Sequence, residues 1–173
     1  MYIKLAGSLL VISGGMAMGI LKAEELKERV EGLQNLRRLL VLLQGELRFH
    51  HTVLSEAFEI VGRQMEHPYQ EFLVETAERL DARDSIGFEG IWKETTEQLF
   101  QKGIFAEKDR QFWQLLGNSL CTLDLETQMD HMQLLMVQTE AELVQAKEEQ
   151  RIKGSLYRTM GGVFGALLVL LII

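Results

Sequence analysis

Residues Met160–Ile173 read Met-Gly-Gly-Val-Phe-Gly-Ala-Leu-Leu-Val-Leu-Leu-Ile-Ile, a stretch without a charged or polar side chain. Extended back to Leu156, it approaches the ~20 residues with which a helix crosses a bilayer. Arg158 can reach toward lipid headgroups, and Tyr157 suits the membrane–water interface. A surface helix of a soluble protein would carry a polar face, which this stretch lacks. We therefore predict a transmembrane helix over 155–173, and a buried C-terminal helix is the alternative.

The beginning of the chain has the same character as its end. From Tyr2 to Leu21 the only charged residue is Lys4, and the apolar run continues into a helical pattern without a break. A cleaved signal peptide is one interpretation, with Ala17-Met18-Gly19 as its cleavage site. The run is longer than the ~7–15 apolar residues usual in such peptides. We predict an uncleaved transmembrane helix over 1–21.

The charges that flank the two apolar segments predict their orientation. Lys and Arg near the ends of membrane helices stay on the cytoplasmic side. Basic residues follow the first segment and precede the last one: Lys22, Lys27, Arg29, Arg37, Arg38, Lys147, Arg151, Lys153 and Arg158. Only Lys4 lies on the other side of the first segment. We therefore expect residues 22–154 to form a cytoplasmic domain, with both termini across the cell membrane.

Between the two segments the apolar residues recur at helical spacing. Two long seams alternate steps of three and four residues, as in a coiled coil. The first is Leu26, Val30, Leu33, Leu36, Leu40, Leu43 and Leu47, and the second is Leu125, Met129, Met132, Met136, Thr139, Leu143 and Ala146. The shorter patterns predict helices over 53–65, 68–80, 86–102 and 106–120. The predicted fold is an all-α bundle of about six helices, built on a long antiparallel helical hairpin.

The composition argues against several classes of function. The chain has 173 residues and a formal net charge of −7, which disfavours nucleic-acid binding. The adjacent pair His50-His51 points in two directions on a helix and has no further ligand at metal-binding spacing. The single cysteine, Cys121, has no activating partner in the sequence and is expected to be a small buried thiol. We therefore predict no enzyme activity, no cofactor and no metal.

The membrane segments carry one further signal. Gly15 and Gly19 are four residues apart, as are Gly161 and Gly165. Small residues at this spacing allow helices to approach closely in lipid. We expect these glycines to pack the two membrane helices together, and packing against other membrane subunits is the alternative.

The chain resembles the stage III sporulation protein AB family over essentially its whole length. The resemblance rests on the order and spacing of several stretches rather than on one motif. They are Leu36-Arg37-Arg38-Leu39-Leu40, Leu54-Ser55-Glu56-Ala57-Phe58, Gln128, Ala146-Lys147-Glu148-Glu149-Gln150, and Leu156-Tyr157-Arg158 before Gly161 and Gly165. The chain departs from the family pattern at Val53, where a proline is common.

The resemblance implies a role in the channel complex between the mother cell and the forespore of a sporulating bacterium. The soluble domain would be similar to the cytoplasmic domains of the type II secretion inner-membrane platform protein. It would lie in the mother-cell membrane around the forespore, bind other membrane subunits and dock a secretion-type ATPase. For docking we single out Arg48, His50, His51 and Glu56. An exported or membrane-bound helical adaptor with no ATPase partner is the alternative.

Overall fold

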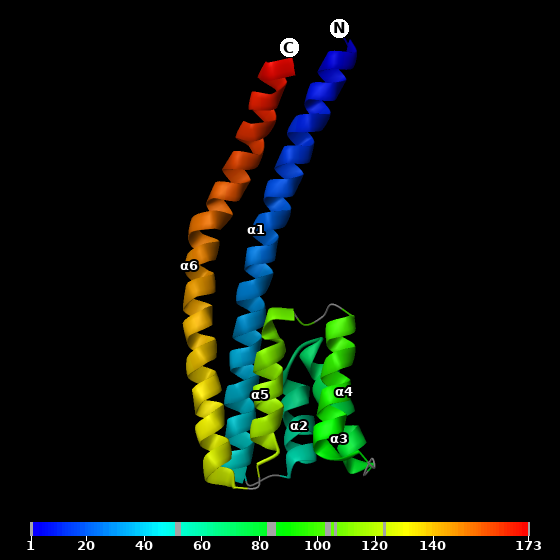
Figure 1. The fold of residues 1–173 in the computed structure, drawn as a ribbon, viewed down its shortest axis with the longest axis vertical. Helices are drawn as coiled ribbons and strands as arrows, with labels where there is room; N and C mark the ends of the chain where they lie inside the picture. Colours follow the sequence, from blue (N-terminus) through cyan, green and yellow to red (C-terminus); the bar gives the residue numbers. More distant parts are fainter. Residues whose placement is uncertain are drawn as a thin grey trace. The chain divides into compact units, whose positions relative to one another are not determined.

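The computed structural model describes the backbone of residues 2–50, 53–82, 86–102, 105, 107–122 and 124–172. Side chains are described from Ser13 to Tyr157 within these ranges, except that of His50. In the described ranges the chain is all-α, which confirms the predicted class (Figure 1). Its α-helices there are α1 (Tyr2–Gly45), α2 (Leu54–Gln64), α3 (Tyr69–Asp81), α4 (Gly87–Gln101), α5 (Arg110–Leu120) and α6 (Leu125–Ile172). A π-helix, η1 (Glu46–His50), follows α1, and a short 3-10 helix, η2 (Glu107–Asp109), precedes α5.

The predicted membrane spans are not tested by the structure. Within the described residues, no helix is both long and apolar enough to span a bilayer. The greater part of both spans, residues 1–12 and 158–173, lies outside the residues whose side chains are described. The two spans therefore stay predictions.

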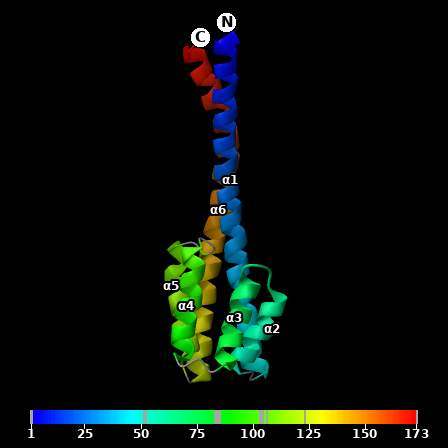
Figure 2. The same ribbon diagram turned by 90° about the vertical axis from the view of Figure 1, so that its right-hand side faces the viewer.

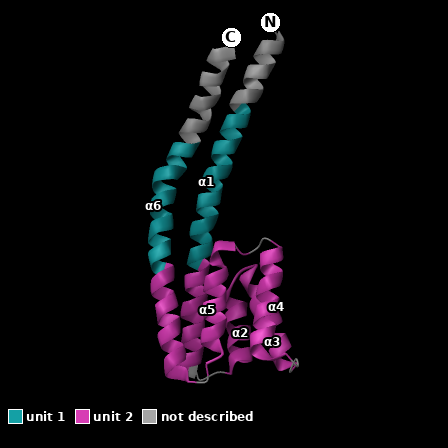
Figure 3. Ribbon diagram, viewed as in Figure 1, with its two compact units in different colours: residues 1–34, 140–173 teal, residues 35–139 magenta. Residues whose placement is uncertain are grey.

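The chain divides into two compact units (Figure 3). Unit 1 comprises residues 1–34 and 140–173, and unit 2 comprises residues 35–139. The helices α1 and α6 each contribute residues to both units. We call residues 13–34 the α1 arm and residues 140–157 the α6 arm; together they are the part of unit 1 whose side chains are described.

In unit 1 the two arms run side by side with opposite chain directions (Figure 3). Arg29 Nη2 of the α1 arm lies 2.7 Å from Glu142 Oε2 of the α6 arm. Beside this pair, the buried apolar residues of the arms are Ala23, Val30, Leu33 and Leu143. Ala23, Val30 and Leu33 are seven and three residues apart, so they share one side of the α1 arm, and Leu143 lies on the buried side of the α6 arm.

In unit 2 the shorter helices pack in chain order. α2 packs against α3, α3 against α4, and α4 against α5. Figure 2 shows α2 with α3 and α4 with α5 as two neighbouring pairs. Because their connections are short, each helix returns along the one before it, as expected for a small helical bundle.

An aromatic cluster forms the centre of unit 2. The ring of Phe72 lies 5.1 Å from that of Trp92 and 5.2 Å from that of Trp113, both edge to face. Phe105 stacks on Trp113 with ring centroids 4.2 Å apart. Such pairs contribute roughly 0.5–1.5 kcal/mol beyond the burial of their area. Phe58 of α2 also contacts Trp92, so the cluster joins α2, α3, α4 and α5.

The ends of the helices differ from the predicted ones. A helix was expected from residue 106, but α5 begins at Arg110, after η2. Arg110 Nε contacts Glu107 Oε1 at 2.5 Å, so an ion pair links η2 to the first residue of α5. The helix expected over 86–102 begins one residue later, and Ile86, which precedes α4, is exposed. Leu125, the first residue of the second predicted seam, is also exposed, because it opens the first turn of α6.

The turn between α5 and α6 is fixed by two polar side chains. Asp124 Oδ2 accepts a hydrogen bond from the backbone N–H of Thr127 at 2.9 Å, which caps the first turn of α6. The bond from the Thr127 hydroxyl and this backbone bond lower the pKa of Asp124. Gln128 Nε2 donates to the carbonyl oxygens of Leu120 at 3.0 Å and Thr122 at 2.8 Å. Gln128 therefore joins the end of α5 to the start of α6.

Candidate docking surface

The predicted docking residues lie where η1 meets α2. Arg48 belongs to η1, Glu56 lies in the first turn of α2, and both side chains are exposed. The His50 side chain and all of His51 lie outside the described residues. Arg48 and Glu56 are therefore accessible at the surface, and their role in docking stays a prediction.

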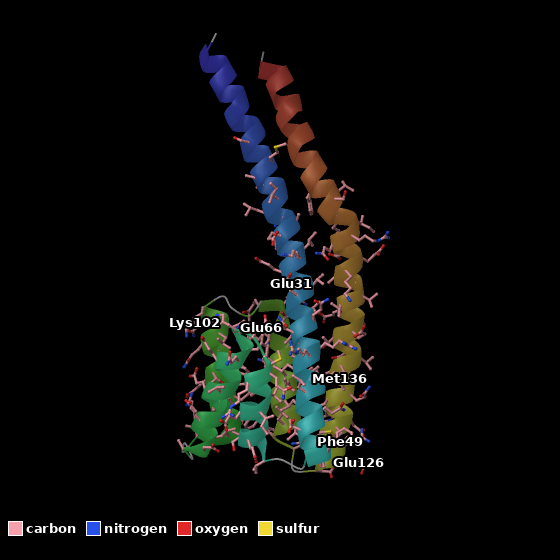
Figure 4. All side chains as sticks on the ribbon, turned by 180° about the vertical axis from the view of Figure 1, so that it is seen from behind. Glu31, Phe49, Glu66, Lys102, Glu126 and Met136 are labelled. Carbon is pink, nitrogen blue, oxygen red and sulfur yellow. The ribbon has the colours of Figure 1, made fainter. Side chains whose placement is uncertain are left out.

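Two apolar side chains that were not predicted from the sequence stand beside them. Phe49 is 74% exposed and Val53 is 70% exposed. Arg48 Cζ lies 5.6 Å from the centre of the Phe49 ring, within the range of a cation–π contact. We call Arg48, Phe49, Val53 and Glu56 the corner surface. Figure 4 shows Phe49 at the same end of unit 2 as Glu126, whereas Lys102 and Glu66 lie at the other end.

The corner surface rests on a packed base. Leu47 directly precedes its members along the chain, Ala57 and Phe58 directly follow them, and all three are buried. The backbone N–H of Ala57 donates to the Val53 carbonyl oxygen at 2.9 Å, so Val53 is tied to the first turn of α2. The exposure of Phe49 and Val53 is therefore a consequence of where the buried residues place the backbone.

The arrangement suits protein binding rather than chemistry. An apolar anchor surrounded by charged residues is the usual composition of a protein–protein interface. Within the described residues there is no group of three His, Cys, Asp or Glu side chains placed to hold a metal ion. The prediction that Cys121 is a buried thiol is wrong, because this cysteine is free and exposed at the end of α5.

A signal for Phe49 was present in the sequence. Leu47 ends the first long seam, and a residue two positions further cannot lie on the same helical face. A large aromatic residue off the seam therefore predicts an exposed ring. The signal for Val53 was its position before the Leu54-Ser55-Glu56-Ala57-Phe58 stretch, where the resemblance placed a proline.

The glycines expected to pack the membrane helices are only partly described. Gly15 is half-buried and Gly19 is buried, both in the α1 arm. Gly161 and Gly165 belong to α6, but they lie beyond the residues whose surroundings are described. Packing between the two pairs therefore stays a prediction.

Comparison with known proteins assigns the chain to a family. The profile of stage III sporulation protein AB matches residues 4–173, nearly the whole chain. The chain belongs to the stage III sporulation protein AB family. This confirms the resemblance that the ordered stretches indicated.

A relative from this family spans the chain from end to end. Stage III sporulation protein AB of Bacillus subtilis (strain 168) is 22% identical over 170 residues, covering 98% of the chain and 99% of the relative. A solved structure of stage III sporulation protein AB aligns with a TM-score of 0.64 at 21% identity. The alignment covers 72% of this chain and 98% of the chain in the solved structure, so the two proteins share a fold over most of their lengths.

Proposed function

We propose that the chain is a non-enzymatic component of the channel complex between mother cell and forespore. It is anchored in the mother-cell membrane by helices over 1–21 and 155–173, and its domain lies in the cytoplasm. There it serves as an assembly platform for other membrane subunits and as a docking site for a secretion-type ATPase. Membership of the stage III sporulation protein AB family supports the sporulation role.

One observation carries the docking proposal: two large apolar side chains stand exposed on a packed base. Phe49 and Val53 are each at least 70% exposed. Burying one such side chain stabilises a complex by roughly 1.5–3 kcal/mol. Arg48 and Glu56 place one charge of each sign beside them, which favours a partner with the complementary pair.

The membrane proposal is supported by charge and by exposed apolar residues. Basic residues of both arms, Lys22 and Lys153 among them, lie next to the predicted spans along the chain. In the α1 arm, Met16, Met18, Ile20 and Leu21 are all more than half exposed. In lipid such residues would lose their contact with water, as a membrane segment requires.

The proposal is tested by binding of the ATPase to the full chain reconstituted in lipid nanodiscs. Phe49→Ser with Val53→Ser should weaken binding about tenfold or more, since 1.4 kcal/mol corresponds to a factor of ten. Arg48→Glu with Glu56→Arg keeps the net charge and should also weaken binding.

Val137→Ser is the matched control. Val137 is 58% exposed on α6, about three turns beyond Glu126 at 3.6 residues per turn. It should leave binding unchanged. Circular dichroism checks that each variant remains folded. Full-strength binding by folded variants of the corner surface would remove this surface from the docking site.

A further inference from the structure

The two arms of unit 1 flank an open groove, lined largely by charged and polar residues, that the docking role does not use. Its volume is about 510 Å³, and we call it the arm groove. It is lined by Ala23 and Lys27 of the α1 arm and by Lys147, Gln150, Arg151, Gly154 and Ser155 of the α6 arm. We propose that the arm groove binds the phosphate headgroup of an anionic phospholipid, a role that rests on the proposed membrane anchoring.

The charge of the lining identifies the kind of ligand. Three of the lining side chains, Lys27, Lys147 and Arg151, are cationic, and none is a carboxylate. Lys27 has Glu24 as a partner at 3.2 Å, and Arg151 has Glu148 at 2.6 Å, but these carboxylates lie outside the lining. Lys147 makes no ion pair with any described residue. A phosphate oxygen is the partner that such a set of cations recognises.

The shape of the groove depends on small residues. Ala23 is buried, and Gly154 lies on the α6 arm one turn beyond Gln150. A Cβ atom built on Gly154 meets no atom within 4 Å, so the space beside this glycine is open. Gln150 and Ser155 add neutral hydrogen-bond donors to the same lining. A phosphate ester carrying further hydroxyl groups would find partners there.

The surroundings favour a lipid over a soluble phosphate. Along the α1 arm, Ile20 and Leu21 precede the groove residue Ala23, and both are more than half exposed. Along the α6 arm, Leu156 and Tyr157 follow Ser155 and are also exposed. Acyl chains can cover such residues, whereas inorganic phosphate cannot. The bound lipid would belong to the cytoplasmic leaflet, which is rich in anionic lipids.

The test measures which lipid the full chain retains. The chain is purified in a neutral detergent with an equimolar mixture of phosphatidylglycerol and phosphatidylcholine, and native mass spectrometry counts the bound lipids. The unchanged chain should retain phosphatidylglycerol preferentially. Each cation near the membrane contributes about a factor of five to the affinity for an anionic lipid. Lys147→Gln with Arg151→Gln removes two cations and should therefore reduce this preference roughly twentyfold or more. Gly154→Leu should reduce it as well, because the new side chain fills the groove without changing any charge.

Lys153→Gln is the matched control. Lys153 is a cation of the same arm that pairs with Glu149 at 3.3 Å and does not line the groove. It should keep the preference for phosphatidylglycerol. Equal retention of the two lipids by the unchanged chain would overturn the inference, and so would an equal loss in the Lys153 variant. Displacement of the lipid by an equal concentration of glycerol phosphate would overturn the choice of a lipid ligand.

A separate measurement distinguishes failure of the inference from failure of the membrane anchor. The full chain is mixed with vesicles of phosphatidylcholine alone and floated on a density gradient. An anchored chain floats with these neutral vesicles whether or not the arm groove binds a headgroup. A chain that stays at the bottom contradicts the anchor, whereas a chain that floats without selecting phosphatidylglycerol contradicts only the headgroup site.

Discussion

Gly117 of α5 packs against the indole ring of Trp92 of α4 with no room for a side chain. A Cβ atom built on Gly117 would lie 2.5 Å from both Cδ1 and Nε1 of Trp92. The same Nε1 donates a hydrogen bond to the carbonyl oxygen of Trp113 at 2.9 Å. The Trp113 carbonyl oxygen and Gly117 lie one turn apart on α5, so the Nε1 edge of the indole is held directly against this helix. The aromatic cluster of unit 2 depends on this contact.

Gly117→Ala should destabilise the protein even though alanine is the better helix former. The gain in helix propensity is at most about 1 kcal/mol. The clash forces Trp92 to move and disturbs its hydrogen bond, and overpacking of this kind costs roughly 1–3 kcal/mol. We expect a net loss in the free energy of unfolding, measured by chemical denaturation. Gly32→Ala is the control, because a Cβ atom there meets nothing within 4 Å. If Gly117→Ala were as stable as Gly32→Ala, the close contact between Gly117 and Trp92 would be contradicted.

Gln128→Ala should weaken the connection between α5 and α6. The Gln128 amide donates to the carbonyl oxygens of Leu120 and Thr122. The substitution removes both hydrogen bonds and leaves two part-buried acceptors without this donor. We expect a cost of roughly 1–3 kcal/mol in denaturation experiments. Gln133→Ala removes an exposed glutamine from the same helix and should cost less than about 0.5 kcal/mol. Equal costs for the two variants would show that the turn does not need Gln128.

Leu40→Asp should unfold or strongly destabilise unit 2. Leu40 is fully buried, and an unpaired carboxylate there costs several kcal/mol against a typical total stability of roughly 5–15. Met136 is only half-buried, so Met136→Asp should cost less. Melting curves followed by circular dichroism measure the order. A Leu40 variant that melts with the unchanged protein would mean that the first seam does not face the core.

Cys121 offers a test of topology in the unaltered chain. It is the only cysteine in the sequence, and it is exposed. A membrane-impermeant maleimide should leave it unlabelled in intact cells and label it after lysis, because residues 22–154 are predicted to be cytoplasmic. Partial burial of the thiol and the negative charge of Glu89 raise its pKa. Labelling after lysis should therefore become faster as the pH rises above neutral. Labelling before lysis would support the exported adaptor instead.

The long seams could be predicted because burial repeats regularly along a helix. Leu33, Leu40, Leu43 and Leu143 all lie in the core, as their spacing required. Glu142 directly precedes the seam residue Leu143, and its side chain is 59% exposed, yet it pairs with Arg29 across the two arms. The spacing gives the direction of a side chain from its own helix. The spacing does not show how far a long arginine side chain on the neighbouring helix can reach.

The ends of the helices and the corner surface were harder to predict. Ile86, Leu125 and Cys121 each lie within one residue of a helix end, where the backbone leaves the regular spacing on which the prediction depends. At the corner surface, Arg48 and Glu56 are exposed, and their docking role stays a prediction. The apolar members Phe49 and Val53 were missed, because the signal of Phe49 is a position off the seam and that of Val53 is a departure from the family pattern, and neither is a polar residue type.

The π-helix η1 also affects how the chain tolerates a change in length. A π-helical turn closes with a hydrogen bond one residue longer than that of an α-helix, so η1 holds one residue that a continuous α-helix would not. Deleting a single residue from Glu46–His50 would allow an ordinary α-helical turn and leave Leu40 and Leu43 in register. The same deletion would rotate Phe49 about the helix axis relative to Val53. Length variation at this point would then alter the corner surface while leaving the part of the core before Glu46 in place.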